Sequence, residues 1–320
     1  MVSYSHSDYG IEGRTAAAIQ QQPYEHRASS SKRQEERRLI MEASTMLRDS
    51  ERLMRQLNKL RRHPIQGVRY FLRWAEFSLR PAESEDKLRR DAQKYWNAPN
   101  TELLNAYSHW RGAGIFADDD LWLALGRKNL ELYQQFCRMM GVTTPPRRIV
   151  EWGCGGGANA VHFAPLAETY VGIDIARPSL QECASQLDAA GFRNFEPVLV
   201  DAGDPDTALA QIPQKCDLFL STYVFELFPT PEYGLQVLKT ARKLLNEGGM
   251  AIIQVRYIRD SWTSRPRRFA YKRNLSATTY RIETFWDEAE KCGFLPQAVR
   301  LVPHEKLNNQ TNYAYFILTT

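Results

Sequence analysis

Residues 148–157, Arg-Ile-Val-Glu-Trp-Gly-Cys-Gly-Gly-Gly, carry the clearest chemical signal in this chain. An apolar stretch runs into an acid, Glu151, and glycines follow at alternate positions, Gly153, Gly155 and Gly157. Glycines at this spacing permit a tight turn in which the backbone approaches a ligand closely. The helical pattern that follows directs the positive end of its dipole to the same place. The sequence therefore predicts a loop that holds a nucleotide-like cofactor and leaves open which one.

Two further acids stand at the ends of the next two apolar stretches. Asp174 lies 21 residues after Gly153, and Asp201 ends the stretch that comes next. An acid at the first position can accept hydrogen bonds from ribose hydroxyls, and an acid at the second can accept from an adenine amino group. The glycine turn alone also fits a nicotinamide dinucleotide, so an oxidoreductase stays an alternative at this point.

The elements that must position these acids alternate between strand and helix. Strands are expected at 148–152, 168–173, 196–200, 216–221, 250–256, 296–302 and 312–319, and helices at 157–166, 178–190, 204–211, 232–246 and 283–292. This alternation is typical of an α/β fold with a parallel sheet covered by helices on both faces. The last two strands leave no room for a helix between them and should form an antiparallel hairpin. Ligands of such sheets bind outside the carboxyl ends of the strands, where Glu151, Asp174 and Asp201 would meet.

The ordered set of motifs resembles the class I S-adenosylmethionine-dependent methyltransferases over roughly residues 145–320. The matching stretches are Glu151-x-Gly153-x-Gly155-x-Gly157, the acids Asp174 and Asp201, residues 224–229 and 244–249, and the final strand around 312–316. The resemblance implies a Rossmann-like, mostly parallel sheet of seven strands in the order 3-2-1-4-5-7-6, with an antiparallel last strand. It also implies S-adenosyl-L-methionine as cofactor and S-adenosyl-L-homocysteine as product. The cofactor-binding residues expected from these motifs are Glu151, Gly153, Gly155, Gly157, Asn159, Asp174, Ile175, Asp201, Ala202 and Ser221.

Candidates for the chemistry at the methyl acceptor lie after the fourth strand and ahead of the glycine loop. Glu226, Tyr223 and His109 are, in that order, the side chains expected to serve as catalytic groups. A hydroxyl acceptor usually needs a base nearby, whereas an amine needs only its free lone pair. The sequence does not decide between methylation of oxygen, nitrogen or carbon.

Residues 256–273 follow the fifth strand and interleave basic with aromatic side chains. We expect this segment to lie over the acceptor, because basic and aromatic groups together suit an anionic or flat ligand. An ordinary solvated loop is the alternative. The expected substrate-binding residues are Arg256, Tyr257, Trp262, Arg267, Arg268 and Tyr271.

The leading hypothesis is a methyltransferase that acts on a hydroxyl of a small molecule or of a glycan or natural-product precursor, either anionic or aromatic. The alternatives are an RNA- or nucleotide-modifying methyltransferase, an N- or C-methyltransferase of a small metabolite, and a non-catalytic scaffold. Residues 27–80 carry 14 Lys and Arg against 6 Asp and Glu, which fits either a nucleic-acid partner or a solvated helix face.

The chain ahead of the glycine loop falls into two expected parts. Residues 1–31 lack a hydrophobic period and are predicted to be a flexible tail. Residues 32–141 are predicted to be a helical cap on a catalytic domain at 145–320. A heptad seam from Leu39 to Leu60 could dock onto the body of the protein or pair with a second subunit, so a homodimer is possible.

The remaining composition excludes several classes of protein. The sequence has no apolar run of about 18 residues, so we expect no membrane span, and its start lacks the apolar core of a signal peptide. Five scattered cysteines without a C-x-x-C pair favour reduced thiols in a cytoplasmic protein over disulfides or a zinc site. We expect no bound metal, because the acids at 118–120 are better explained as the start of a helix.

Overall fold

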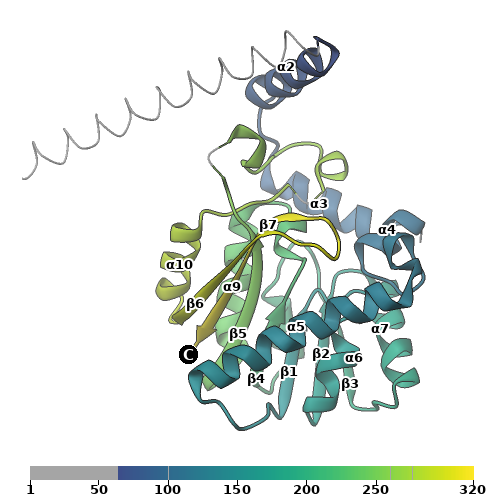
Figure 1. The fold of residues 1–320 in the computed structure, drawn as a ribbon, viewed down its shortest axis with the longest axis vertical. Helices are drawn as coiled ribbons and strands as arrows, with labels where there is room; N and C mark the ends of the chain where they lie inside the picture. Colours follow the sequence, from purple (N-terminus) through teal and green to yellow (C-terminus); the bar gives the residue numbers. More distant parts are fainter. Residues whose placement is uncertain (1–63, 100, 260, 276) are drawn as a thin grey trace, which may run out of the picture. The chain divides into compact units, whose positions relative to one another are not determined.

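The structure is a computed structural model that describes residues 64–99, 101–259, 261–275 and 277–320 (Figure 1). The tail expected at 1–31 and the heptad seam expected within 32–62 lie outside these residues. The larger of the two compact units runs from Phe77 to Thr320. Helix α2 (Pro64–Leu79) starts on a proline, which suits a first helical turn because no N–H is needed there.

The core of the larger unit is a seven-stranded sheet with the order β3-β2-β1-β4-β5-β7-β6. Its strands are β1 (Arg148–Trp152), β2 (Thr169–Asp174), β3 (Phe195–Leu199), β4 (Cys216–Ser221), β5 (Leu245–Arg256), β6 (Leu295–His304) and β7 (Thr311–Thr319). The first five strands are parallel, and β7 runs antiparallel to both of its neighbours. The expected fold class, strand order and final hairpin are thereby confirmed.

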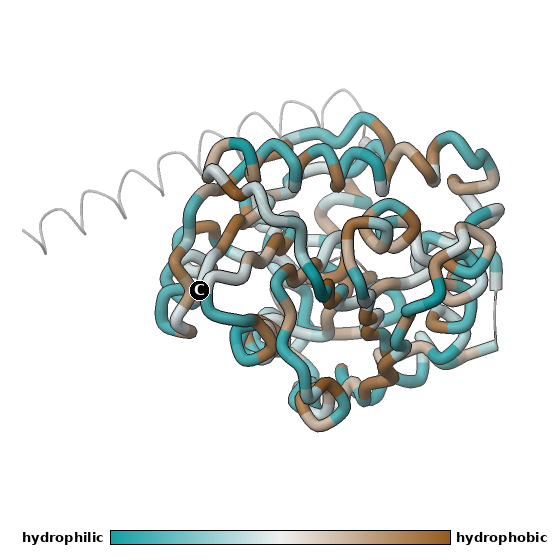
Figure 2. Tube along the Cα trace, turned by 90° about the horizontal axis from the view of Figure 1, so that it is seen from below, coloured by the Kyte–Doolittle hydropathy of each residue, from teal (hydrophilic) through white to brown (hydrophobic). Residues whose placement is uncertain are grey.

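Helices cover both faces of this sheet. The elements other than α2 are α3 (Glu85–Trp96), α4 (Glu102–Tyr107), η1 (Gly114–Ala117), α5 (Asp119–Met140), α6 (Ala160–Phe163), η2 (Ala164–Leu166), α7 (Arg177–Ala189), α8 (Thr207–Gln211), η3 (Phe225–Leu227), α9 (Pro231–Leu244), η4 (Trp262–Ser264), η5 (Tyr271–Asn274) and α10 (Ile282–Lys291). Hydrophilic and hydrophobic residues alternate along the outer helices (Figure 2), as expected of helices with one buried side.

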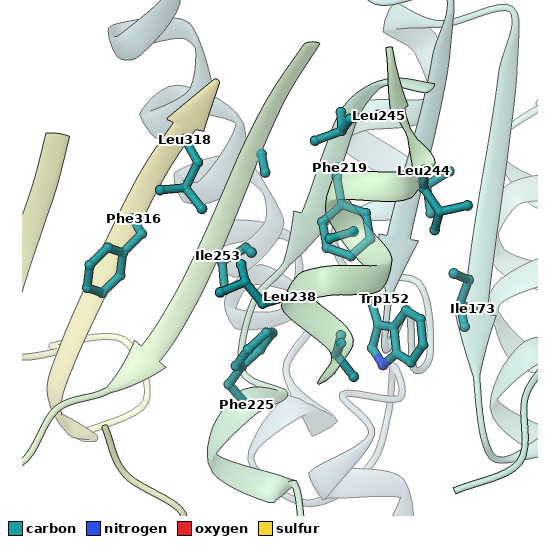
Figure 3. Packing of buried hydrophobic residues seen from close by; sticks show 14 of the residues in the cluster. Trp152, Ile173, Phe219, Phe225, Leu238, Leu244, Leu245, Ile253, Phe316 and Leu318 are labelled. Atoms are coloured by element: carbon teal, nitrogen blue, oxygen red, sulfur yellow. The ribbon is translucent and has the colours of Figure 1, made fainter. Parts of the chain in front are cut away.

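Successive residues of each strand point to opposite faces, so each face has its own apolar cluster. Phe219 and Ile253 pack with Leu238 and Leu244 of α9 (Figure 3), in a cluster that also includes Phe285 of α10. Their neighbours Leu218 and Ile252 pack with α5, α6 and α7 on the other face. Every residue of β1 is buried, as is usual for a central strand of a parallel sheet covered on both sides.

Helix α5 joins the segment ahead of the glycine loop to the sheet. Asp118 caps its start by accepting a hydrogen bond from the amide of Asp120 at 2.9 Å, which agrees with the helix start expected from the acids at 118–120. Gly141 ends it in the left-handed conformation. Because α3, α4 and α5 all belong to the unit that begins at Phe77, the boundary expected near 141–145 lies inside that unit.

The contact between α5 and the start of α6 depends on a residue without a side chain. A Cβ on Gly126 would lie 1.9 Å from the carbonyl oxygen of Ala158. We predict that Gly126→Ala lowers the free energy of unfolding by about 1–3 kcal/mol, although alanine is the better helix former. Glu131→Ala, on the exposed side of the same helix, should stay within about 0.5 kcal/mol of the unchanged protein. Chemical denaturation measures both, and a neutral or stabilising Gly126→Ala would contradict the packing described.

Candidate active site

The glycine loop between β1 and α6 is pressed against the chain that precedes it. Gly153, Gly155 and Gly157 all have positive φ angles, of 76°, 51° and 87°. A Cβ on Gly155 would lie 2.3 Å from the carbonyl oxygen of Ser108, and one on Gly156 would lie 2.7 Å from the Cα of Trp110. Glycine is therefore required here both by backbone conformation and by the close approach of residues 108–110.

The amides of this loop already have partners within the protein. Those of Gly153 and Cys154 donate to the carbonyl of Ile173 at 2.7 and 3.2 Å. The Gly155 amide donates to the Asp174 carboxylate at 3.0 Å. The amides of Gly156 and Gly157 donate to the carbonyl oxygens of Ser108 and Cys154, at 2.7 and 3.0 Å. None of these five amides is left to hold a pyrophosphate, which is how a dinucleotide-binding loop works.

A cavity that is partly open to solvent lies at the carboxyl ends of the strands beside this loop. Ten of the residues predicted from the sequence line it: His109, Glu151, Gly153, Gly155, Asn159, Asp174, Ile175, Ala202, Tyr223 and Tyr271. The sheet topology thus brings together the ends of β1 and β2, the turn after β3 and the residue pair after β4, as the parallel arrangement requires.

Three of the predicted cofactor residues lie outside the lining. Gly157 turns the chain toward α7, where a Cβ would meet Cys183 at 3.3 Å. The hydroxyl of Ser221 donates to the carbonyl of Trp152 at 3.1 Å and so ties β4 to β1. Asp201 is exposed, and its carboxylate accepts from the amide of Gly203 at 2.6 Å.

Among the described residues of the basic segment after β5, Tyr271 alone lines the cavity. Arg268 forms an ion pair with Glu232, and Arg267 donates to the side chain of Asn274 at 3.0 Å. The ring of Trp262 lies 5.7 Å from that of Phe77. Arg256 and Tyr257 also lie outside the lining, the latter with its amide donating to the carbonyl of Asn312 at 2.7 Å.

Glu226, the first catalytic candidate, is buried behind the cavity wall. One carboxylate oxygen accepts from the hydroxyl of Tyr313 at 2.9 Å. The other has no hydrogen-bond partner in the described part of the chain. Burial raises the pKa of Glu226, which favours its protonated form. Glu226 is not among the residues that line the cavity.

His109 and Tyr223 are neighbours in the cavity wall, and their ring centroids are 5.2 Å apart. Both have left-handed backbones, with φ angles of 54° and 61°, which are unfavourable for residues with a side chain. Desolvation lowers the pKa of His109 to about 4, so its imidazole is neutral at pH 7. No described residue hydrogen-bonds to this ring, and His109 is among the residues that line the cavity.

The charges that line the cavity are carboxylates. Glu151 is almost fully buried, and desolvation raises its pKa to about 7 although Tyr170 and Asn159 donate to it at 2.5 and 2.7 Å. Desolvation likewise raises the pKa of Asp174 to about 6, against hydrogen bonds from the amides of Ala176 and Gly155. Among the described residues that line the cavity there is no Lys or Arg. The wall therefore suits a ligand that carries positive charge.

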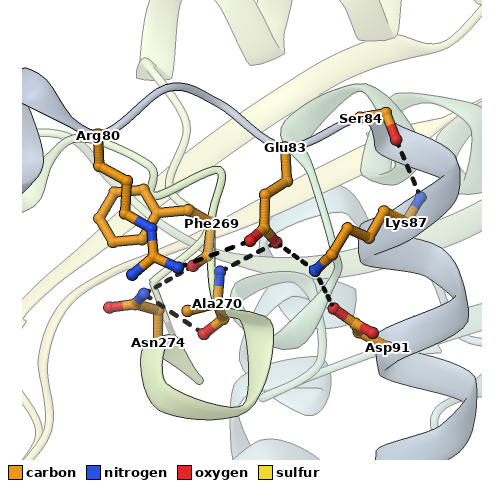
Figure 4. Close-up of polar contacts among 8 residues, drawn as sticks. All are labelled: Arg80, Glu83, Ser84, Lys87, Asp91, Phe269, Ala270 and Asn274. Atoms are coloured by element: carbon orange, nitrogen blue, oxygen red, sulfur yellow. Dashed lines mark hydrogen bonds and ion pairs between the residues drawn. The ribbon is translucent and has the colours of Figure 1, made fainter.

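Two segments far apart in the sequence meet at one side of the cavity, α3 and the turn η5. The indole of Trp96 donates to the hydroxyl of Tyr271 at 2.8 Å, and that hydroxyl donates to the carbonyl of Leu227 at 2.6 Å. The start of α3 is tied to the same turn, because Glu83 accepts from the amide of Ala270 at 3.1 Å (Figure 4). The helices ahead of the glycine loop thus form part of the site.

Several residues of the site were not predicted individually. They are Ala92, Trp96, Tyr107, Ser108, Trp152, Cys154, Ala158, Thr222, Val224, Leu227, Phe228, Pro229 and Tyr233, all of which line the cavity. Residues 85–141 are rich in aromatic side chains, and this composition is a signal by which Trp96 and Tyr107 could have been found. Nothing in the local pattern distinguishes the residues that line a cavity from those that fill the core.

Comparison with known proteins agrees with this geometry. Residues 150–251 match the family model of a methyltransferase domain. The structure of magnesium protoporphyrin IX methyltransferase from Synechocystis, solved with S-adenosylhomocysteine, is similar over 72% of this chain and 98% of its own, with a TM-score of 0.50 and 13% identity. An S-adenosylmethionine-dependent methyltransferase from Clostridium acetobutylicum covers 63% of this chain and 92% of its own, with a TM-score of 0.46 and 12% identity. No curated protein matches the sequence.

The fold, the motifs and the matching domain define the class of the protein. Residues 150–251 are a methyltransferase domain, and the activity of this part of the chain is that of an S-adenosylmethionine-dependent methyltransferase. The cofactor expected from the sequence is thereby confirmed. No helix of the described residues is long and apolar enough to cross a membrane.

The raised pKa of Glu151 leads to a prediction about how the stability of the ligand-free protein depends on pH. Between the ordinary pKa of 4.5 and the folded value of about 7, the folded state binds the proton more tightly than the unfolded chain does. Stability is therefore predicted to fall as pH rises through this window, by about 3 kcal/mol from this group. Urea denaturation at pH 4.5–7.5 should show a shallower decline for Glu151→Gln than for the unchanged protein. An identical slope in both would mean that Glu151 titrates normally.

Proposed function

We propose that this methyltransferase acts on a hydroxyl of a flat, uncharged small molecule. The observation that carries the proposal is the composition of the cavity wall, which includes seven Phe, Tyr or Trp side chains and has no Lys or Arg among the described residues. An aromatic wall binds a flat ligand by stacking, whereas an anionic ligand would need a positive partner. The basic segment, which favoured an anionic acceptor or RNA in the sequence, contributes one uncharged residue, Tyr271.

The residues present fit S-adenosylmethionine at the glycine-loop end of the cavity. The carboxylate of Asp174 has acceptor capacity beyond its two amide contacts and would take the ribose hydroxyls. Glu151, held by Asn159, would face the charged methionine end. Ile175 and Ala202 would lie against the adenine. When bound, the cofactor supplies a methyl group activated by its sulfonium.

The amide of Ala202 is already engaged in this structure. It donates to the side chain of Gln93 on α3 at 2.8 Å. Asn97 of the same helix donates to the carbonyl of Ile175 at 2.9 Å. These two contacts support a role for α3 as a wall over the adenine end of the proposed site.

At the other end of the cavity, His109 is the group we propose as the base. Its neutral imidazole can accept a hydrogen bond from the acceptor hydroxyl and take the proton as the new carbon–oxygen bond forms. The ring of Tyr223 would hold the plane of the acceptor and limit the access of water. Glu226 lies behind the cavity wall, where its carboxylate accepts a hydrogen bond from the hydroxyl of Tyr313.

Binding of the product cofactor tests the ribose assignment. Asp174→Asn should weaken the affinity for S-adenosylhomocysteine about 10–100-fold, because a hydrogen bond to a charged acceptor is worth about 1.5–3 kcal/mol. Isothermal titration calorimetry measures this. The control is Asp188→Asn, an exposed acid at the far end of α7, which should bind as the unchanged protein does. Equal affinity in all three proteins would remove Asp174 from the site.

Acceptor preference tests the proposed chemistry. Labelled S-adenosylmethionine is offered with flat phenols, with the matching aromatic amines, and with their carboxylated or phosphorylated forms. We predict turnover of the phenols, and a loss of about 100-fold in kcat for His109→Gln with little change in cofactor affinity. His304→Gln, in the β6–β7 hairpin outside the cavity lining, serves as control.

Two results would contradict this proposal. Preferred turnover of the carboxylated or phosphorylated compounds would show that a cationic surface binds the acceptor after all. Turnover of amines that is insensitive to His109→Gln would identify an N-methyltransferase that needs no base.

A further inference from the structure

Asn129 is a buried polar residue in the middle of α5, outside the matched methyltransferase domain, and its amide touches three elements at once. Its nitrogen donates to the side-chain oxygen of Asn159 at 2.8 Å and to the hydroxyl of Thr222 at 3.3 Å. Its oxygen accepts from the hydroxyl of Tyr315 at 3.3 Å. A buried amide is costly unless its groups are paired, and here both its nitrogen and its oxygen are.

One branch of these contacts forms a closed ring of hydrogen bonds that includes the backbone amide of Tyr223. The hydroxyl of Tyr315 accepts from Gln254 at 3.2 Å, and the side-chain oxygen of Gln254 accepts from the amide of Tyr223 at 2.6 Å. Thr222, the next residue back, returns the ring to Asn129. This ring of hydrogen bonds therefore stabilises the backbone at Tyr223, where the φ angle is positive and unfavourable.

The other branch leads to the acid of the glycine motif. Asn159 donates from one nitrogen to the hydroxyl of Thr222 at 2.8 Å and to the carboxylate of Glu151 at 2.7 Å. With that nitrogen turned to the carboxylate, the oxygen of Asn159 must face the nitrogen of Asn129. The amide of Tyr223 can only donate and an ionised Glu151 can only accept, so each end of the network dictates the orientation of the amides between them.

We propose that Asn129 is a positioning residue that links the cofactor end of the cavity at Glu151 to the acceptor end at Tyr223. The roles of these two ends rest on the function proposed above. Without the Asn129 amide, Asn159 can rotate away from Glu151, and Thr222 and Tyr315 lose the partner that closes the ring. Both ends of the cavity should then loosen together, although Asn129 touches neither ligand.

The test uses S-adenosylhomocysteine alone, so it does not depend on the acceptor. In Asn129→Leu, which keeps the volume and removes the amide, Glu151 loses the donation from Asn159 that favours its charged form. The pH at which affinity falls on acidification should move upward by about one unit. Tyr170 and Asp174 also face Glu151, and the step from Asp174 near pH 6 should stay in place. Asn129→Ala is the second variant, should leucine not be accommodated.

Hydrogen exchange at the amide of Tyr223 is the second readout. Loss of the ring should accelerate exchange about tenfold or more at this amide, which lies 94 residues further along the chain. The control is Leu132→Ala, a buried residue of the same helix outside the network, which destabilises the protein without touching these contacts. It should change neither the pH midpoint nor the exchange at Tyr223.

The proposal is overturned if the Asn129 variants leave both quantities unchanged, or if Leu132→Ala moves them equally. A failure of the acceptor proposal is a separate matter, because it would be seen only in turnover of the phenols and in the His109 variant.

Discussion

The close contact between the glycine loop and the backbone of residues 108–110 is the constraint on which the site depends. It leaves no room for a Cβ at Gly155 or Gly156 and uses the Gly156 amide for the carbonyl of Ser108. The same contact fixes where the next residue, His109, enters the cavity. The amides of this loop are hydrogen-bonded within the protein and cannot also bind a phosphate. The conformation of the loop therefore disfavours a cofactor that is held by its pyrophosphate.

Strain and burial are concentrated where the acceptor is proposed to bind. His109 and Tyr223 have left-handed backbones, and Glu226 and Tyr223 each have a buried polar atom without a partner in the described part of the chain. Such features cost stability and persist only where the surrounding packing is strong. The apolar clusters on both faces of the sheet and the hydrogen-bond ring through Asn129 supply that support.

The strand order and the cofactor were predictable because they depend on local patterns repeated in a fixed order. Each acid or glycine stands at the end of an apolar stretch, and parallel strands bring those ends together. The acceptor side was predicted less well for a physical reason. A basic segment after β5 can pair with neighbouring acids, as Arg268 does with Glu232, and then contributes no charge to the cavity. The contacts of Asn129 join residues 30 to 186 positions apart, which no local pattern reveals.

The two carboxylates in a wall without cations have a consequence for the catalytic cycle. With the cofactor bound as proposed, methyl transfer would convert its sulfonium into an uncharged thioether beside these carboxylates. Glu151 and Asp174, whose pKa values lie near 7 and 6, would then be less well compensated and more readily protonated. The electrostatics of the wall would therefore favour the donor over the spent cofactor and work against product inhibition.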